Sequence, residues 1–167
     1  ALFFATGCSE KTADMNVENV EQPEVANTIH DTNIADGSFS ALDKTADGQY
    51  FMINGQKVFI ANIYFGFDKY DLAGENNENA MSNASKLAAL KSDTTVKVSG
   101  NTDEWGTDEY NYALGLKRAN SVKDVLVANG VVANVSLVSL GESSPVCTEK
   151  TKDCWAKNRR VEHDLSK

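Results

Sequence analysis

The hydrophobic and polar positions along the later part of the chain alternate between two periods, one typical of strands and one typical of helices. Two short apolar runs, residues 50–53 and 58–61, flank Asn54 and Gly55. Both of these residues tolerate positive φ, so the pattern predicts a β-hairpin. The second run continues to Phe65, and a loop is expected to follow it.

Two helices are expected where apolar residues recur at helical spacing. The first spans residues 75–91, and its apolar stripe consists of Ala80, Ala84, Leu87 and Ala88. The second begins after Thr107, which can cap its N-terminus, and ends before Gly130, which suits the C-terminal end of a helix. Asp108 and Glu109 then fall in its first turn, where the helix dipole favours acidic side chains.

Three further strands are predicted after the hairpin. Residues 94–100 alternate with a period of two and are rich in β-branched side chains, and residues 135–140 and 159–165 are also strand-like. The order is hairpin, helix, strand, helix, strand, strand. This order predicts an α+β fold, a two-layer sandwich in which a mixed β-sheet carries its helices on one face.

The segment before residue 49 has a different composition. It is polar, has few aromatic residues and shows no sustained period, so it is expected to form a flexible tether. Residues 1–49 contain nine acidic and two basic residues, and the whole chain carries a net charge of −8. A net-acidic chain without a basic stripe is repelled by phosphates, so no nucleic-acid partner is expected.

The first of the three cysteines, Cys8, follows a short apolar run that ends in the small residues Ala5, Thr6 and Gly7. This looks like the end of a signal peptide and a lipoprotein cleavage box, after which the Cys8 thiol would carry a lipid. The alternative is an ordinary apolar N-terminus. We therefore expect three parts: a signal-peptide remnant at 1–7, a lipid-anchored acidic tether at 8–48, and a domain at 49–167.

No pattern of catalytic or metal-binding residues is apparent. The two histidines, His30 and His163, lie far apart in the sequence, and neither has cysteine or carboxylate neighbours at metal-ligand spacing. The sequence contains no HExxH motif, no GxSxG motif and no glycine-rich phosphate loop. An enzyme, a metal site and a bound cofactor are therefore not expected.

Candidate binding residues are concentrated around the start of the second predicted helix. Asp103 lies in the polar loop before it, and Asn111, Leu114 and Arg118 share one helix face. An aspartate can hold an ammonium group and an arginine can hold a carboxylate through two hydrogen bonds, so the pair Asp103 and Arg118 can recognise a zwitterion. From spacing alone, an internal ion pair between the two is an equal alternative.

Three motifs resemble the C-terminal domain of outer membrane protein A and its lipoprotein relatives. They are residues 64–71, residues 100–111 and residues 156–161. The lipoprotein box and the acidic tether are similar to those of the peptidoglycan-associated lipoproteins, a branch of this family. Asn101 stands where many relatives have histidine, and Trp105 where many have arginine.

The resemblance implies a site for the diaminopimelate residue of peptidoglycan stem peptides. It assigns Asp103 to the ligand ammonium and Arg118 to its carboxylate. The remaining residues that it places at or near the pocket are Phe67, Asp68, Thr102, Asn111, Leu114, Asn158 and Arg159. Asn158 and Arg159 either support the pocket or only stabilise the last strand.

The resemblance also places the chain in an oxidising compartment. With Cys8 lipidated, Cys147 and Cys154 remain as a pair, and a disulfide between them is expected. Metal binding by the two thiols is the weaker alternative.

The function that the resemblance implies is non-covalent attachment of the outer membrane to the cell wall. The protein would be lipid-anchored on the periplasmic face of the outer membrane and would bind peptidoglycan. Its expected protein partner is the periplasmic β-propeller protein of the Tol system, which acts in envelope integrity and cell division. The alternatives are a protein-interaction adaptor of the same fold that does not bind the wall, and an enzyme that acts on peptidoglycan.

Overall fold

A computed structural model describes residues 41–167. The segment predicted as a signal-peptide remnant, Cys8 and His30 lie outside these residues, as does most of the predicted tether at 8–48. No helix in the described part is long and apolar enough to cross a membrane.

The predicted hairpin is part of a three-stranded antiparallel sheet. Its strands are β1 (Ala41–Thr45), β2 (Gly48–Ile53) and β3 (Gln56–Ala61), in the order β1-β2-β3. Asn54 and Gly55 both have positive φ, 49° and 79°, as expected for the turn. Strand β1 lies within the range predicted as tether. All five of its residues are exposed, so backbone pairing with β2, and not an apolar pattern, makes it a strand.

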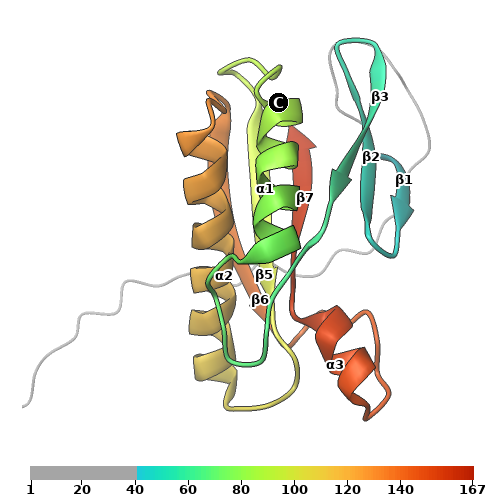
Figure 1. Cartoon of the computed structure of the whole chain (residues 1–167), viewed down its shortest axis with the longest axis vertical. Coiled ribbons are helices and arrows are strands. Elements are labelled where there is room, and N and C mark those ends of the chain that lie inside the picture. Colours follow the sequence, from blue (N-terminus) through green and yellow to red (C-terminus); the bar gives the residue numbers. More distant parts are fainter. Residues whose placement is uncertain (1–40) are drawn as a thin grey trace, which may run out of the picture. The chain divides into compact units, whose positions relative to one another are not determined.

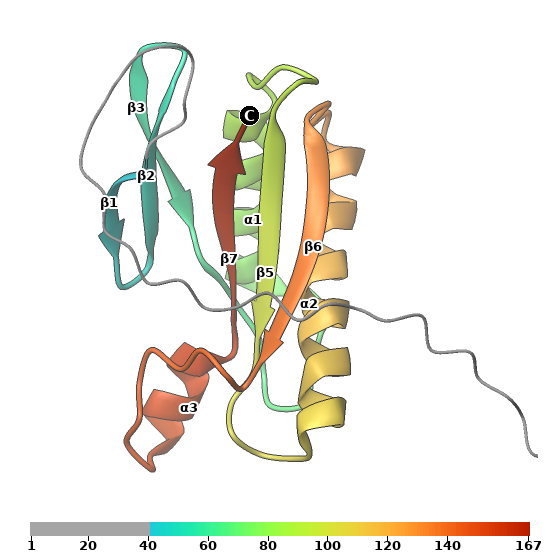
Figure 2. The same cartoon turned by 180° about the vertical axis from the view of Figure 1, so that it is seen from behind.

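A second sheet has four strands in the order β4-β7-β5-β6. They are β4 (Ile63–Tyr64), β5 (Thr95–Asn101), β6 (Asn134–Gly141) and β7 (Arg160–Ser166). Strands β5 and β6 are parallel, and β7 runs antiparallel to both β4 and β5. Figure 2 shows β7, β5 and β6 side by side, with the last strand of the chain inside the sheet.

Helices α1 (Gly74–Leu87) and α2 (Asp108–Ala128) lie on one face of this sheet (Figure 1). The predicted α+β architecture, a mixed sheet with helices on one face, is confirmed. Thr107 caps α2 by accepting a hydrogen bond from the Tyr110 amide. A third helix, α3 (Lys152–Asn158), was not predicted, because it is short and has no apolar stripe.

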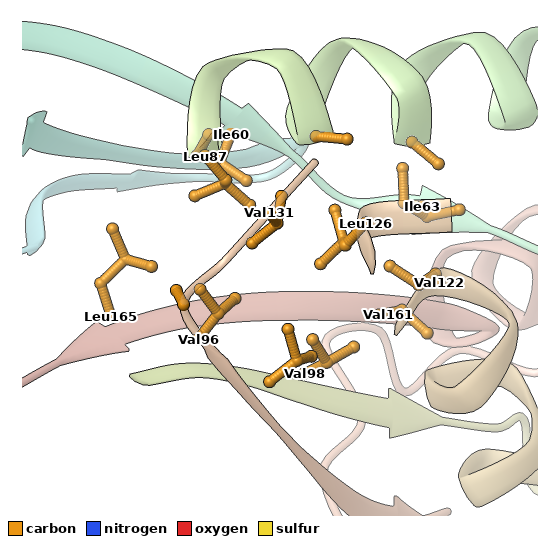
Figure 3. Close-up of a cluster of buried hydrophobic side chains, with 14 of the residues drawn as sticks. Ile60, Ile63, Leu87, Val96, Val98, Val122, Leu126, Val131, Val161 and Leu165 are labelled. Atoms are coloured by element: carbon orange, nitrogen blue, oxygen red, sulfur yellow. The ribbon is translucent and has the colours of Figure 1, made fainter. Parts of the chain in front are cut away.

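The core lies between the helices and the four-stranded sheet (Figure 3). Val96 and Val98 of β5 and Val161 of β7 face Val122 and Leu126 of α2, and all five are fully buried. The predicted apolar stripe of α1 is confirmed for Ala80, Ala84 and Leu87, which are also fully buried. This core fixes α2 against the sheet and so determines where its polar residues point.

Two glycines bring α2 unusually close to β5. A Cβ atom on Gly100 would lie 1.8 Å from the carbonyl oxygen of Gly115, and a Cβ on Gly115 would lie 2.8 Å from the carbonyl oxygen of Gly100. Any side chain at Gly100 would therefore push the helix away from the strand. Arg118 lies about one turn beyond Gly115, so this close approach brings its guanidinium to the end of β5.

Candidate functional site

Arg118 is a fully buried cation at the edge of the sheet. Its guanidinium donates to three backbone carbonyl oxygens: Nε to Lys69 at 2.8 Å, Nη1 to Asn101 at 2.9 Å and Nη2 to Gly66 at 3.1 Å. Its Cζ atom lies 5.4 Å from the centre of the Phe65 ring. Arg118 thereby holds the loop after β4 against the end of β5.

No carboxylate forms an ion pair with Arg118 in the part of the chain that the structure describes. Burial lowers the pKa of Arg118 to about 10, and the nearby Asp103 carboxylate opposes this shift. A guanidinium has five N–H groups, and three hydrogen bonds leave some of them uncommitted. The site therefore contains a desolvated positive charge without a directly bonded anion.

Asp103 forms its ion pair with a different arginine. Its Oδ2 lies 3.1 Å from Arg159 Nη1, and its Oδ1 accepts from the Trp105 amide at 3.3 Å. Arg159 also donates from Nε to the Phe65 carbonyl at 2.9 Å. Spacing allowed an internal ion pair between Asp103 and Arg118. In the structure Asp103 pairs with Arg159 and not with Arg118.

The loop after β4 supplies the outer part of the site. Phe67 exposes 63% of its surface, and Asp68 has a positive φ of 56°. The Asp68 carboxylate accepts a hydrogen bond from the Tyr110 hydroxyl at the start of α2. This bond raises the pKa of Tyr110 above its usual value. Phe67 and Asp68 therefore lie on the loop that Arg118 holds through Gly66 and Lys69.

Asn111, Leu114 and Thr102 are buried around the same strand end. The amide nitrogen of Asn111 donates to Glu142 at 2.9 Å, while its Oδ1 is buried without a hydrogen-bond partner among the described residues. The Thr102 hydroxyl donates to the Asp103 carbonyl at 2.9 Å. Asn111 thus offers a free buried acceptor.

Asn158 has a structural role in the loop that precedes it. Its Oδ1 accepts from the amides of Val146 and Cys147 at 2.9 and 3.0 Å, and its amide nitrogen donates to the Cys147 carbonyl at 2.7 Å. The expected disulfide between Cys147 and Cys154 is present, with the two Cα atoms 5.2 Å apart. Both the amide oxygen and the amide nitrogen of Asn158 are therefore bonded to this loop.

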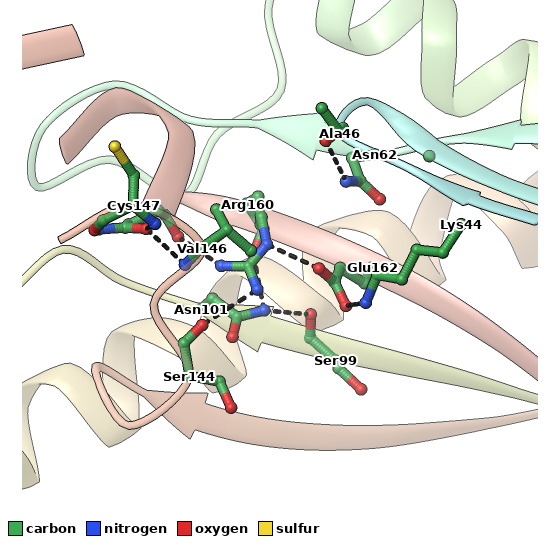
Figure 4. Close-up of polar contacts among 12 residues, drawn as sticks. Lys44, Ala46, Asn62, Ser99, Asn101, Ser144, Val146, Cys147, Arg160 and Glu162 are labelled. Atoms are coloured by element: carbon green, nitrogen blue, oxygen red, sulfur yellow. Dashed lines mark hydrogen bonds and ion pairs between the residues drawn. The ribbon is translucent and has the colours of Figure 1, made fainter. Parts of the chain in front are cut away.

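Arg160 is a buried residue near the site that the sequence did not single out. It donates to Glu162 at 2.7 Å and to the Ser144 carbonyl at 3.0 Å, and Lys44 pairs with the same Glu162 at 2.9 Å (Figure 4). Asn101 lies beside it, donating to the Arg160 carbonyl. Its place next to Arg159 in the sequence was a signal, but Arg159 caps the end of α3 and Arg160 is the first residue of β7, so only the structure separates their roles.

The site as a whole combines two carboxylates, Asp68 and Asp103, with two guanidinium groups, Arg118 and Arg159. The site therefore carries two negative and two positive side chains, of which Asp103 and Arg159 form an ion pair. Such an arrangement suits a ligand group that bears both an ammonium and a carboxylate. No cluster of histidine, cysteine and acidic side chains that could hold a metal ion occurs among residues 41–167.

The chain matches the OmpA family over residues 64–159. The chain belongs to the OmpA family. The matched range contains Phe67, Asp68, Asp103, Arg118 and Arg159, so the site lies within the part that defines the family.

Its relatives within this family include peptidoglycan-associated lipoproteins, as the motifs predicted. The protein of that name from Pseudomonas putida is 37% identical over 97% of this chain and 90% of its own length. The one from Pasteurella multocida is 48% identical over 59% of this chain, and the match spans 66% of the relative. Similarity to the Pseudomonas protein thus extends beyond the OmpA-family domain.

A solved structure shows the same fold. The crystal structure of the peptidoglycan-associated lipoprotein from Burkholderia pseudomallei is 36% identical, with a TM-score of 0.58. The match covers 63% of this chain and 89% of that one.

Proposed function

We propose that this OmpA-family domain binds peptidoglycan without covalent chemistry, through the diaminopimelate residue of an uncrosslinked stem peptide. Bound in this way, the protein attaches the outer membrane to the cell wall. The names of its relatives support this proposal, since several are called peptidoglycan-associated lipoproteins.

One structural observation carries the proposal: Arg118 is buried and has no carboxylate partner among the described residues. Burying an unpaired cation costs several kcal/mol, and hydrogen bonds to neutral carbonyls offset only part of that cost. A ligand carboxylate would supply the missing counter-charge. Ionisable groups kept in such costly environments are concentrated at functional sites.

The residues have distinct proposed roles. Arg118 binds the side-chain carboxylate of diaminopimelate, and Asp103 binds its ammonium group. The free Oδ1 of Asn111 provides a further acceptor for an ammonium N–H. Phe67, Asp68, Thr102 and Leu114 form the remaining wall. Arg159 orients Asp103, while Asn158 acts only through the loop that it holds.

Attachment to the membrane and to a partner completes the proposed role. Cys8 carries the lipid, the segment after it provides reach, and the protein lies on the periplasmic face of the outer membrane. The proposed protein partner is the periplasmic β-propeller protein of the Tol system, whose site on the domain overlaps the peptidoglycan site. Through it the protein contributes to envelope integrity and cell division.

The test uses two stem peptides that differ in one group. One contains diaminopimelate and the other contains lysine, which has the same ammonium but lacks the second carboxylate. We expect calorimetry to show saturable binding of the first and binding at least about tenfold weaker of the second, the scale of one charged hydrogen-bonded group.

Three variants locate the site. Arg118→Lys keeps the charge but not the planar fork, and we expect it to weaken binding of the diaminopimelate peptide and to reduce the preference over lysine. Asp103→Asn should weaken both peptides. Lys117→Ala, which removes an exposed cation from the next position of α2, should change neither. If a folded wild-type domain binds neither peptide, the proposal is wrong and the adaptor alternative replaces it.

A further inference from the structure

A second hollow lies beside the proposed peptide site, under the disulfide loop. Its volume is about 240 Å³, and its wall includes Thr102, Glu104, Glu142, Pro145 and Trp155. Thr102 and Glu104 flank Asp103 in the chain. The hollow and the proposed peptide site therefore share one loop, and a single extended ligand can reach both.

Trp155 is held in place before any ligand arrives. Its indole Nε1 donates to Glu104 Oε1 at 2.8 Å, and the other oxygen of this carboxylate accepts from Lys150. The residue follows Cys154, whose disulfide with Cys147 closes the loop. A preorganised aromatic wall binds with little loss of conformational entropy.

Trp105 packs against Trp155, although it is not itself among the residues that line the hollow. Its ring centre lies 5.3 Å from that of Trp155, with an angle of 76° between the rings, which is an edge-to-face contact. Whichever ring supplies the edge, at least one face of Trp105 is not covered by Trp155. Trp105 exposes 52% of its surface, so an aromatic face is available next to a polar hollow.

This combination fits the ring of an N-acetylated amino sugar. The C–H face of a pyranose packs on an indole face, while its hydroxyl and acetamido N–H groups need acceptors. Glu142, Glu149 and Thr148 provide carboxylate and hydroxyl oxygens on the same wall. Lys150 already pairs with Glu104, the carboxylate that holds Trp155, so Glu142 and Glu149 are the carboxylates left on this wall as acceptors for a ligand.

We propose that this hollow is a saccharide subsite, in which the tryptophans and the acceptors of the disulfide loop bind an N-acetylated amino sugar of the glycan strand. The inference rests on the proposed function, since it makes the glycan a second point of contact for the same wall ligand. It also gives a role to the exposed Trp105, which packs on the partly buried Trp155 of α3 beside the disulfide loop.

The two tryptophans make a direct test possible. They are the only ones in the sequence, so all indole fluorescence comes from this cluster. Titration of the full chain with N,N′-diacetylchitobiose should change the emission saturably. In Trp105→Ala, Trp155 remains as the reporter, and we expect the response to weaken strongly. Tyr112→Ala is the matched control, because Tyr112 is 57% exposed but, unlike Trp105, has no ring contact with Trp155 among the described residues.

A second comparison separates this inference from the proposed function. A stem peptide that carries its disaccharide should bind wild type roughly 3- to 10-fold tighter than the bare peptide, the scale of one aromatic contact. Trp105→Ala should abolish this ratio and leave affinity for the bare peptide unchanged. If both ligands bind wild type equally and the saccharide alone gives no response, the subsite is wrong while peptide binding stands. A response to a simple diamine in place of the saccharide would also overturn it.

Discussion

Arg159 Nη1 lies 3.1 Å from Asp103 Oδ2, and this ion pair joins the start of β7 to the loop that follows β5. The same guanidinium donates to the carbonyl of Phe65 at the end of β4. Both partners are largely buried, with 15% of the Arg159 side chain and 6% of the Asp103 side chain exposed. One arginine thus holds three strand ends together at the proposed binding site.

We expect Arg159→Met to lower the free energy of unfolding by about 2–4 kcal/mol, because it leaves the Asp103 carboxylate buried without its ion partner. Urea denaturation followed by circular dichroism measures this change. Lys97→Met is the matched control. It breaks the pair between Lys97 and Asp164, whose side chains are 46% and 48% exposed, and should cost less than about 1 kcal/mol. Equal losses in the two variants would contradict a special role for Arg159.

The close approach at Gly100 gives a second prediction. Gly100→Ala places a Cβ where the Gly115 carbonyl oxygen lies, so α2 must move away from β5. We expect a loss of roughly 2–4 kcal/mol in unfolding free energy. Gly66→Ala should change stability by less than about 0.5 kcal/mol, since its Cβ would meet only the flexible Lys69 side chain. A mild effect at Gly100 would mean that the helix can shift without cost.

His163 makes stability depend on pH. It lies opposite Val98 on the core side of β7, is 3% exposed, and has no hydrogen-bond partner for either ring nitrogen among the described residues. Burial lowers its pKa to about 4, and the neighbouring Asp164 and Glu162 only partly oppose this. Between about pH 4 and pH 6.5, the imidazole of His163 is therefore neutral in the folded protein but protonated in the unfolded chain.

Since the unfolded state binds the extra proton, stability should fall as the pH drops from about 6.5 to about 4 and then level off for this group. The expected loss is roughly 3 kcal/mol. Denaturation midpoints of wild type and His163→Leu across this range provide the measurement. The leucine variant should lose most of the slope between pH 6.5 and pH 4. Parallel pH profiles for the two proteins would show that His163 does not titrate in the folded state as described.

The disulfide between Cys147 and Cys154 closes a short loop. Its reduction should cost roughly 2–3 kcal/mol in the chain-entropy model. Asn158 holds the same loop through three hydrogen bonds, so we expect the reduced protein to stay folded. Denaturation with and without reductant tests this, and Cys147→Ser/Cys154→Ser serves as the permanently reduced form. No difference between oxidised and reduced protein would mean that the hydrogen bonds alone define the loop.

Local signals in the sequence were sufficient for the hairpin and for α2, whereas the disulfide was predicted from the oxidising compartment that the family resemblance implies. Asn54 and Gly55 set the turn because positive φ is a property of those residues, and Thr107 caps α2 through its own hydroxyl. The motifs around Asp103 and Arg118 likewise identified the family. Strand β1 and helix α3 were missed because one depends on pairing with β2 and the other is only seven residues long.

The sequence by itself determined the hairpin, the two long helices and three further strands, because these follow from periods of a few residues. Spacing also predicted the candidate pair Asp103 and Arg118, whereas Asp68 and Arg159 were assigned through the family resemblance. Only the tertiary structure decided that β7 inserts between β4 and β5, and that Asp103 therefore pairs with Arg159 and not with Arg118. Partners so far apart in the chain are selected by the order of strands in the sheet. That order depends on packing of the whole core, which no local pattern encodes.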